Sequence, residues 1–187
     1  MCGRYYVDDE TEQDIERLMK LMDQGQLIER FGDINPGQMA MTLTAEGPRQ
    51  MRWGFTGRGR LLINARAETV LERPTFATHI QQRRCLLPAA GFYEWDPAKE
   101  KVTCTAEHNG TIIMAGFYRT EEDGPHFIIV TTAANDSMRR IHDRMPLILS
   151  EEEAISWLHG GTSFIYLLDK IPDPVTTFRA YEQQSLL

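Results

Sequence analysis

The chain has 187 residues, 42% of them hydrophobic and 25% charged, and a formal net charge of −7 at pH 7. A chain of this length forms one domain with a substantial core, and no apolar run approaches membrane-spanning length. The polar, acidic start shows no secretion signal, so we expect a cytoplasmic protein. Cys2, Cys85 and Cys104 are widely spaced, which argues against a disulfide framework and against a cysteine-rich zinc site.

The net negative charge conceals an uneven distribution of cations. Residues 49–84 contain eight arginines against two acidic residues, a net charge of +6, whereas residues 1–48 carry −6. The guanidinium group can grip a phosphate at two points, so the segment is a candidate phosphate-binding strip. The alternative is a solvated face that pairs with the acidic N-terminal segment.

Hydrophobic periodicity predicts an amphipathic helix over residues 11–23, with Thr11 able to cap its start. Residues 32–37, which include Asn35-Pro36-Gly37, are expected to form a loop or turn. Apolar or alternating stretches separated by Gly, Pro and Asp predict short strands at 39–43, 50–55, 84–88, 91–95, 111–118 and 126–132.

The remaining chain is expected to alternate short helices with loops. Residues 134–141 are expected to form a short helix, and the capping-box pair Ser150 and Glu153 opens another that runs to residue 158. Further loops or turns are predicted at 159–163, Pro172 and Pro174. Many short strands with a few flanking helices indicate an α+β domain with a curled, barrel-like sheet of mixed or antiparallel strands.

Cys2 has the most distinctive chemistry in the chain. If Met1 is removed, Cys2 carries a free α-amine and a thiol on adjacent carbons. The amine can form a Schiff base with an aldehyde, and the thiol can then close a thiazolidine ring on the same carbon. The amine titrates near about 7.7–8.0 and the thiol near about 8.5, so both have some nucleophilic form at neutral pH. Taken alone, however, Cys2 is simply the residue that follows the start codon.

Four other residues each allow a functional and a structural interpretation. Trp53 either stacks on a nucleobase or fills the core, and Asn64 either orients a substrate oxygen or caps a turn. Glu94 lies between aromatic residues, a setting that suits proton transfer, although a carboxylate paired with an arginine is commoner. His142 is either an acid–base group or, more commonly, a hydrogen-bonded structural histidine.

Together, these stretches resemble one known family. The motifs that carry the resemblance occur in this order: Met1-Cys2-Gly3-Arg4, Asn64-Ala65-Arg66-Ala67-Glu68-Thr69, Arg84-Cys85-Leu86-Leu87-Pro88 leading into Gly91-Phe92-Tyr93-Glu94-Trp95, and Ile141-His142-Asp143-Arg144-Met145-Pro146. The chain resembles the SRAP (SOS-response-associated peptidase) family of abasic-site processing proteins. The similarity extends to about Leu149, and more loosely to Trp157, and it implies a single SRAP-like domain over residues 1–187.

The resemblance implies a protein that binds abasic sites in single-stranded DNA and crosslinks itself to them. The ring-opened deoxyribose offers an aldehyde, with which Cys2 would form a stable thiazolidine. By the same resemblance, Asn64 would position the sugar or the N-terminus, and Glu94 would stabilise the iminium and move protons. His142 would act as acid or base on the sugar hydroxyl and would assist reversal.

The resemblance also implies how DNA is held and what else the protein does. The implied DNA-binding residues are Arg4, Asn35, Pro36, Trp53, Arg66 and Trp95. Peptidase activity would be directed at the protein's own Met1, unless a host aminopeptidase removes it, and β-elimination would give weak AP-lyase activity. No metal or cofactor is needed. We expect a monomer with no membrane partner, associated with the nucleoid when bound to DNA.

Two features depart from the family pattern. Many relatives have Asn-x-Ala-Pro where this chain has Asn35-Pro36, one residue tighter, which alters the geometry of the wedge between bases. The C-terminal segment over residues 178–187 is also short and lacks the Val-Asn pair of the family's last strand. That difference bears on sheet closure more than on catalysis.

Three other functions compete with this one. Class II glutamine amidotransferases also begin Met-Cys-Gly, but Arg4, the single-domain length and the downstream motifs argue against a glutaminase. A non-catalytic single-strand binding module would explain the arginine strip and Trp53, but not why Asn64, Glu94 and His142 accompany Cys2. A zinc protein with Cys2 and His142 as ligands lacks a paired-ligand spacing.

Overall fold

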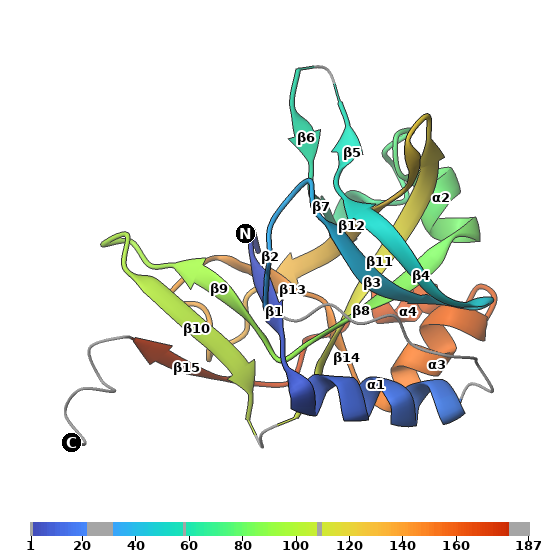
Figure 1. Cartoon of the computed structure of the whole chain (residues 1–187). Helices are drawn as coiled ribbons and strands as arrows, with labels where there is room; N and C mark the ends of the chain where they lie inside the picture. The colour runs from blue at the N-terminus through green and yellow to red at the C-terminus, as the bar shows by residue number, and fades with distance from the viewer. Residues whose placement is uncertain (1, 22–31, 58, 108–109, 180–187) are drawn as a thin grey trace.

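The structure is a computed structural model in which residues 2–21, 32–57, 59–107 and 110–179 are described. A ring of five hydrogen-bonded strands forms a small barrel (Figure 1), in the order β4 (Gly47–Trp53), β3 (Met39–Thr44), β8 (Arg84–Ala89), β11 (Ile112–Glu121) and β12 (Gly124–Ala133). The pairing of β4 with β12 is parallel and closes the ring, and the other four pairings are antiparallel.

Short strands extend the barrel at its margins. Three of them are β7 (Asn64–Arg66), which runs parallel to β12, β13 (Arg144–Pro146), which pairs with the end of β12, and β14 (Ile148–Leu149), which pairs with β11. A two-stranded hairpin of β5 (Phe55–Thr56) and β6 (Leu61–Leu62) projects at the top of Figure 1.

A second sheet, the side sheet, packs against the barrel. It has five strands in the order β15 (Val175–Arg179), β10 (Lys101–Ala106), β9 (Gly91–Trp95), β1 (Tyr5–Val7) and β2 (Gly32–Ile34). The chain passes from barrel strand β8 into β9 through Ala90 alone. Gly91 is required at this crossing, since a Cβ there would lie 2.5 Å from the carbonyl oxygen of Cys104.

Four helices flank the barrel in the described part of the chain (Figure 1): α1 (Asp9–Leu21), α2 (Ala77–Gln82), α3 (Glu151–His159) and α4 (Phe164–Leu167). A 3-10 turn, η1 (Ala67–Thr69), follows β7. No helix of these is long and apolar enough to span a membrane. The predicted α+β fold, with a barrel-like sheet and flanking helices, is confirmed.

Alternate residues of β8, β11 and β12 pack into two different hydrophobic clusters. Leu87, Met114 and Phe127 join the cluster shared with the side sheet, whereas their neighbours along the strands join the cluster under the helices. Both faces of these strands are therefore buried, which explains their nearly continuous apolar sequences. Trp157 anchors α3 on the barrel, because its indole N–H lies 3.2 Å from the carbonyl oxygen of Cys85 and 3.0 Å from that of Gly116.

The six predicted strands are all present. The strand at 91–95 has the predicted bounds, the one at 50–55 is divided between β4 and β5, and the other four have shifted ends. Several other predictions are corrected. Helix α1 begins at Asp9, and its cap is Asp8, whose carboxylate accepts from the backbone N–H of Thr11 at 2.9 Å. Residues 22 and 23 lie outside the described part. The expected loop at 32–37 contains β2, although Pro36-Gly37 is a turn.

The predicted helix at 134–141 is wrong, since these residues form turns. The Asn135 side chain accepts from the backbone N–H of Ser137 at 3.1 Å and donates to the carbonyl oxygen of Pro172 at 3.0 Å. Such local side-chain bonds compete with a helix. The sequence analysis did not predict helices α2 and α4, or strands β1, β6, β7, β10, β13, β14 and β15. The expected change in the last strand of the family concerns residues that lie mostly outside the described part, but β15 pairs with β10 along its whole length.

The capping box of α3 is confirmed and allows a stability test. Ser150 Oγ accepts from the backbone N–H of Glu153 at 3.3 Å, and Glu153 accepts from the N–H of Ser150 at 2.8 Å. Ser150→Ala is therefore expected to lower the free energy of unfolding by about 1 kcal/mol, measured by urea denaturation. Ser163→Ala is the control, because Ser163 precedes α4 without capping it. Equal losses in both variants would contradict the assignment.

Candidate active site around Cys2

Cys2 lies immediately before β1, in the hydrophobic cluster between the side sheet and the barrel, with no exposed surface. Its thiol lies 3.8 Å from the carbonyl oxygen of Arg4. Its own carbonyl oxygen accepts a hydrogen bond from Asn64 Nδ2 at 2.9 Å. This bond ties the N-terminal segment to β7, whose register against β12 pairs Asn64 with Ile129.

The Asn64 side chain has one polar atom, Oδ1, that accepts no hydrogen bond from the described residues. This oxygen is buried. A buried amide oxygen without a donor is costly unless a ligand or water satisfies it. Asn64 can therefore hold the Cys2 backbone with its NH2 group while its oxygen accepts from another group beside Cys2.

Glu94 shares the buried face of the side sheet with Cys2. It is 3% exposed and pairs in register with Val102 on β10, while Phe92 pairs with Cys104. Burial raises the pKa of the Cys2 thiol well above its usual value, and the negative charge of Glu94 raises it further. Burial followed by the same carboxylate raises the pKa of Cys104 to about 12. Both thiols are therefore protonated at neutral pH.

His142 is half-buried in the segment between β12 and β13. Its Nδ1 lies 2.9 Å from the backbone N–H of Arg144 and 2.8 Å from Asp143 Oδ1. A ring whose Nδ1 accepts from Arg144 carries its proton on Nε2, whereas a ring with a proton on Nδ1 donates from it to Asp143. His142 is linked to the Cys2 cluster indirectly, because Met138 contacts Cys104 at 3.6 Å between the sulfur atoms.

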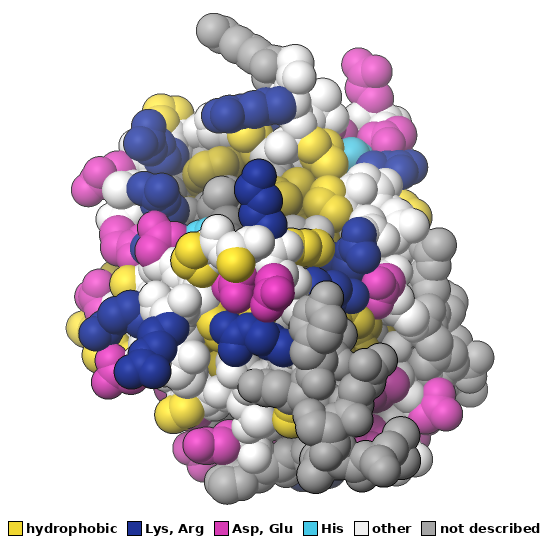
Figure 2. Space-filling model, turned by 90° about the vertical axis from the view of Figure 1, so that its left-hand side faces the viewer, with side chains coloured by type: hydrophobic (Ala, Val, Ile, Leu, Met, Phe, Trp, Pro, Cys, Tyr) yellow, Lys and Arg dark blue, Asp and Glu magenta, His cyan; other side chains and the backbone are white. Residues whose placement is uncertain are grey.

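The predicted DNA-binding residues occupy different surroundings. Arg4 lies 3.6 Å from Asp33 Oδ2, and its guanidinium lies 5.9 Å from the ring centre of Trp95, which is 41% exposed. Asn35 and Pro36 form a half-buried turn, and Arg66 is exposed at the end of β7. On the side of the molecule shown in Figure 2, Lys and Arg side chains surround an apolar patch.

Trp53 does not belong with these surface residues. It has no exposed area, its indole N–H donates to the carbonyl oxygen of Ile63 at 3.0 Å, and its ring stacks on that of Phe127. The base-stacking role expected of Trp53 is therefore corrected to the alternative role of filling the core.

The arginine strip is also partly structural. Arg84 donates to the carbonyl oxygens of Trp157 and of Gln81, the latter at 2.8 Å, and its guanidinium lies 4.3 Å from the ring centre of Phe164. Arg52 pairs with Asp123 at 3.0 Å. These two arginines therefore stabilise the fold. Arg66, another arginine of the strip, is exposed and lies on the same strand as Asn64.

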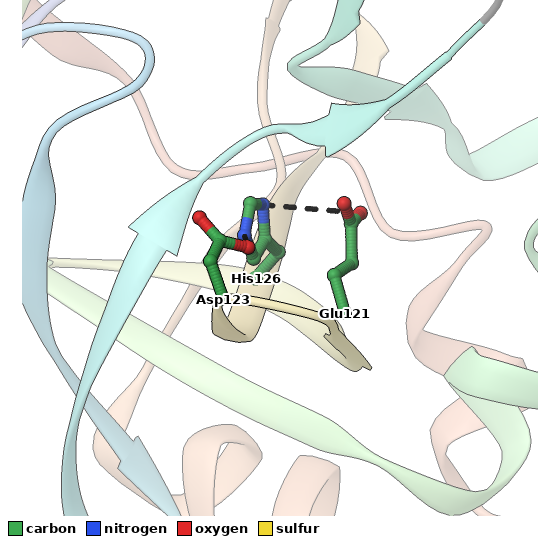
Figure 3. Close-up of side chains that lie close together, drawn as sticks. All are labelled: Glu121, Asp123 and His126. Atoms are coloured by element: carbon green, nitrogen blue, oxygen red, sulfur yellow. Dashed lines mark hydrogen bonds and ion pairs between the residues drawn. The ribbon is translucent and has the colours of Figure 1, made fainter.

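One group of potential metal ligands, Glu121, Asp123 and His126, occurs in the described residues (Figure 3). Both ring nitrogens of His126 already face acceptors, Nδ1 at 2.6 Å from the carbonyl oxygen of Gly54 and Nε2 at 2.7 Å from Asp123 Oδ1. Glu121 accepts from Arg119 at 2.9 Å. The group is thus a satisfied hydrogen-bonded cluster that joins β12 to the start of β5.

Two residues with no role in the sequence analysis are paired by the structure. Glu68 and Arg144 form a two-point ion pair, with distances of 2.5 Å and 2.8 Å. The hydrogen bonds from Arg144 hold the pKa of Glu68 below its usual value. Each residue lies in a motif that also holds a predicted catalytic residue, which is the signal that could have drawn attention to them.

The comparisons with known proteins bear directly on this site. The family model described as SOS response associated peptidase (SRAP) matches residues 1–183. The chain belongs to the SRAP family. The abasic site processing protein YoqW of Bacillus subtilis (strain 168) is 31% identical over 211 residues, covering all of this chain and 94% of YoqW. The abasic site processing protein YedK of Escherichia coli (strain K12) is 34% identical over 109 residues, covering 54% of this chain and 49% of YedK.

Solved structures agree with the family assignment. A phage-related protein from Bordetella bronchiseptica superposes with a TM-score of 0.76 at 26% identity, covering 96% of this chain and 94% of the other. A protein from Bacteroides thetaiotaomicron gives the same TM-score at 22% identity, which establishes a shared fold. The family resemblance predicted from the motifs is confirmed.

The two tryptophans allow the corrected role of Trp53 to be tested. Trp53→Phe is expected to lower the free energy of unfolding by about 1–3 kcal/mol, because a cavity forms and the Ile63 carbonyl loses one of its two donors, the other being the Ile129 N–H. The matched variant Trp95→Phe, at an exposed position, is expected to cost less than about 0.5 kcal/mol. Chemical denaturation measures both. A stable Trp53→Phe variant with weakened DNA binding would restore the stacking role.

Proposed function

We propose that this protein binds abasic sites in single-stranded DNA and forms a covalent thiazolidine crosslink through Cys2 after Met1 is removed. The observation that carries the proposal is the hydrogen bond from Asn64 to the Cys2 carbonyl, beside the buried carboxylate of Glu94. An N-terminal cysteine held in this way can react only at one place and in one orientation.

The crosslink forms in two steps that release one water molecule. The Cys2 α-amine attacks the aldehyde of the ring-opened sugar, and loss of water leaves an imine. The thiol then adds across the carbon–nitrogen double bond, so that sulfur bonds to carbon and a proton ends on nitrogen. Because the thiol is protonated in this site, ring closure needs a base, and Glu94 can accept the thiol proton and return it to nitrogen.

The neighbouring groups supply the remaining functions. The unoccupied acceptor of Asn64 can bind the N-terminal amine or a sugar hydroxyl. His142 acts as acid or base on the sugar hydroxyl as the ring opens, and assists reversal. Arg4 adds positive charge close to the amine, which favours the unprotonated nucleophile.

Single-stranded DNA is held by exposed cationic and aromatic groups. Arg4 and Arg66 bind the phosphates that flank the lesion, and Trp95 offers a ring for stacking beside Arg4. The turn at Asn35 and Pro36 forms the edge against which neighbouring bases rest.

The same site accounts for the other expected activities. Removal of Met1, by the protein itself or by an aminopeptidase, is the peptidase step, and β-elimination from the imine gives weak lyase activity. We place the protein in the DNA-damage response of the cytoplasm and nucleoid, as a monomer with a single domain and without a metal or cofactor.

Crosslinking can be tested with protein whose Met1 has been removed, as verified by mass. We expect a band that survives denaturation only with an oligonucleotide that carries one abasic site. Cys2→Ala should give no band, and Cys2→Ser should give only an imine that borohydride traps, because its hydroxyl is a far weaker nucleophile than a thiol. Glu94→Gln should slow adduct formation by about 100-fold or more.

Controls make this experiment decisive. Glu100→Gln removes the same charge from an exposed residue in the connection between β9 and β10 and should react like the wild type. Heat-stable adducts from Cys2→Ser would contradict thiazolidine formation. If folded, processed wild-type protein gives no band, the proposal fails, and a glutaminase assay becomes the next experiment.

Phosphate contacts predict the salt dependence of DNA binding. For single strands, each contact contributes about 0.7 to the slope of log affinity against log salt concentration. Arg66→Ala should reduce the slope by about 0.7, measured by fluorescence anisotropy with an uncleaved abasic analogue. Arg17→Ala, on α1 and paired with Glu151, should leave the slope unchanged. A salt-independent affinity would eliminate the arginine contacts.

A further inference from the structure

The ion pair of Glu68 and Arg144 joins two segments that each carry a residue of the candidate site. Glu68 lies in the turn η1, just after Asn64 and Arg66 of β7. Arg144 is the first residue of β13 and comes two positions after His142. The two residues are 76 positions apart in sequence. Their contact is a side-chain link between the segment whose Asn64 binds the Cys2 carbonyl and the segment that carries the histidine.

The link crosses the strand between the two segments. Thr131 of β12 pairs with Arg66 of β7 on one side and with Pro146 of β13 on the other. The guanidinium of Arg144 donates to the Thr131 carbonyl oxygen at 2.6 Å and reaches Glu68 beyond it. The segments before and after β12 are thus fixed to each other as well as to the strand.

Arg144 also sets the orientation of the histidine. Its backbone N–H donates to His142 Nδ1 at 2.9 Å, which favours a neutral ring with its proton on Nε2. Asp143 Oδ1, 2.8 Å from the same nitrogen, favours a proton on Nδ1 instead, so the position of the Arg144 N–H decides between the two tautomers. The carbonyl oxygen of Asp143 accepts from Ala134 N–H at 3.0 Å and closes the turn. A shift of the Arg144 backbone would therefore release Nδ1 and allow the other tautomer.

Glu68 is the anion that fixes the Arg144 side chain, while the pairing of β13 with β12 holds its backbone. The Arg144 side chain is only 11% exposed, so its charge needs a nearby anion, whereas the Glu68 side chain is 46% exposed. An ion pair with a carboxylate as exposed as that of Glu68 adds little to the free energy of unfolding. Its two hydrogen bonds mainly fix the direction of the Arg144 guanidinium.

We propose that Glu68 is a positioning residue: through Arg144 it holds the His142 ring in the Nε2–H tautomer and at a fixed place relative to Asn64 and Cys2. The inference rests on the proposed crosslinking function. It assigns Glu68 no contact with DNA or with the reacting atoms, so its loss should affect the chemical step and leave DNA binding intact.

The kinetic test uses processed, full-length protein under single-turnover conditions with saturating abasic oligonucleotide. Glu68→Gln keeps the size of the side chain and removes its charge, and Glu68→Ala removes the grip entirely. We expect the maximum crosslinking rate to fall by about tenfold in Glu68→Ala and less in Glu68→Gln, with unchanged DNA affinity. Asp136→Asn, a matched loss of charge at an exposed residue in the turn preceding His142, should match the wild type.

The second measurement is independent of activity. Long-range 1H–15N correlation spectra of the protein without DNA report which ring nitrogen of His142 carries the proton. We expect the Nε2–H tautomer with a hydrogen-bonded Nδ1 in the wild type and in Asp136→Asn, and a mixture of tautomers in Glu68→Ala. Glu68→Gln provides the same readout if the alanine variant does not fold.

The outcomes separate this inference from the proposed function. Absence of crosslinking by the wild type overturns the proposed function, and the inference that rests on it. If the wild type crosslinks, an unchanged rate in both Glu68 variants overturns the positioning role alone. A slower rate without a change in tautomer, or a loss confined to DNA affinity, overturns it as well, because Glu68 would then act by another route.

Discussion

Strand β12 is the element on which the rest of the arrangement depends. It is hydrogen-bonded to β4, β7, β11 and β13, so it closes the barrel and also fixes the two short strands that carry the candidate site. Asn64 enters the site because β7 runs parallel to β12, and the histidine segment follows directly from the end of β12. A shift in the register of this strand would turn alternate side chains to the opposite cluster and separate the site residues.

The site itself lies at the junction of the barrel and the side sheet. Cys2 belongs to the same hydrophobic cluster as Phe92 of the side sheet and Phe127 of the barrel, and Asn64 and Glu94 approach it from these two sheets. The polar groups are few and buried, so their orientation is set by packing instead of by solvent. This explains how short strands far apart in the sequence can hold the three side chains of the candidate site in a fixed relation.

The sequence predicted the parts of this structure that local patterns determine. Strands with apolar or alternating residues, the Ser150 capping box and the family motifs were all recognisable. The sequence left both a base-stacking and a core role open for Trp53, because its burial depends on Phe127, far away in the sequence. Arg84 was counted among the candidate phosphate-binding arginines, but in the folded protein its guanidinium donates to backbone carbonyl oxygens. The turn at 134–141 depends on Asn135 reaching Pro172. Adjacency in space, including that of Glu68 and Arg144, could not be read from local composition.

The burial of Cys2 has a consequence for the lifetime of the protein. A thiol that is protonated and withdrawn from solvent reacts slowly with peroxides and alkylating agents, which attack exposed thiolates. The proposed crosslink would consume Cys2 in a single event, so the thiol would have to survive unmodified until an abasic site is met. Under that proposal, enclosure between the two sheets protects the nucleophile from oxidation and alkylation before it is used.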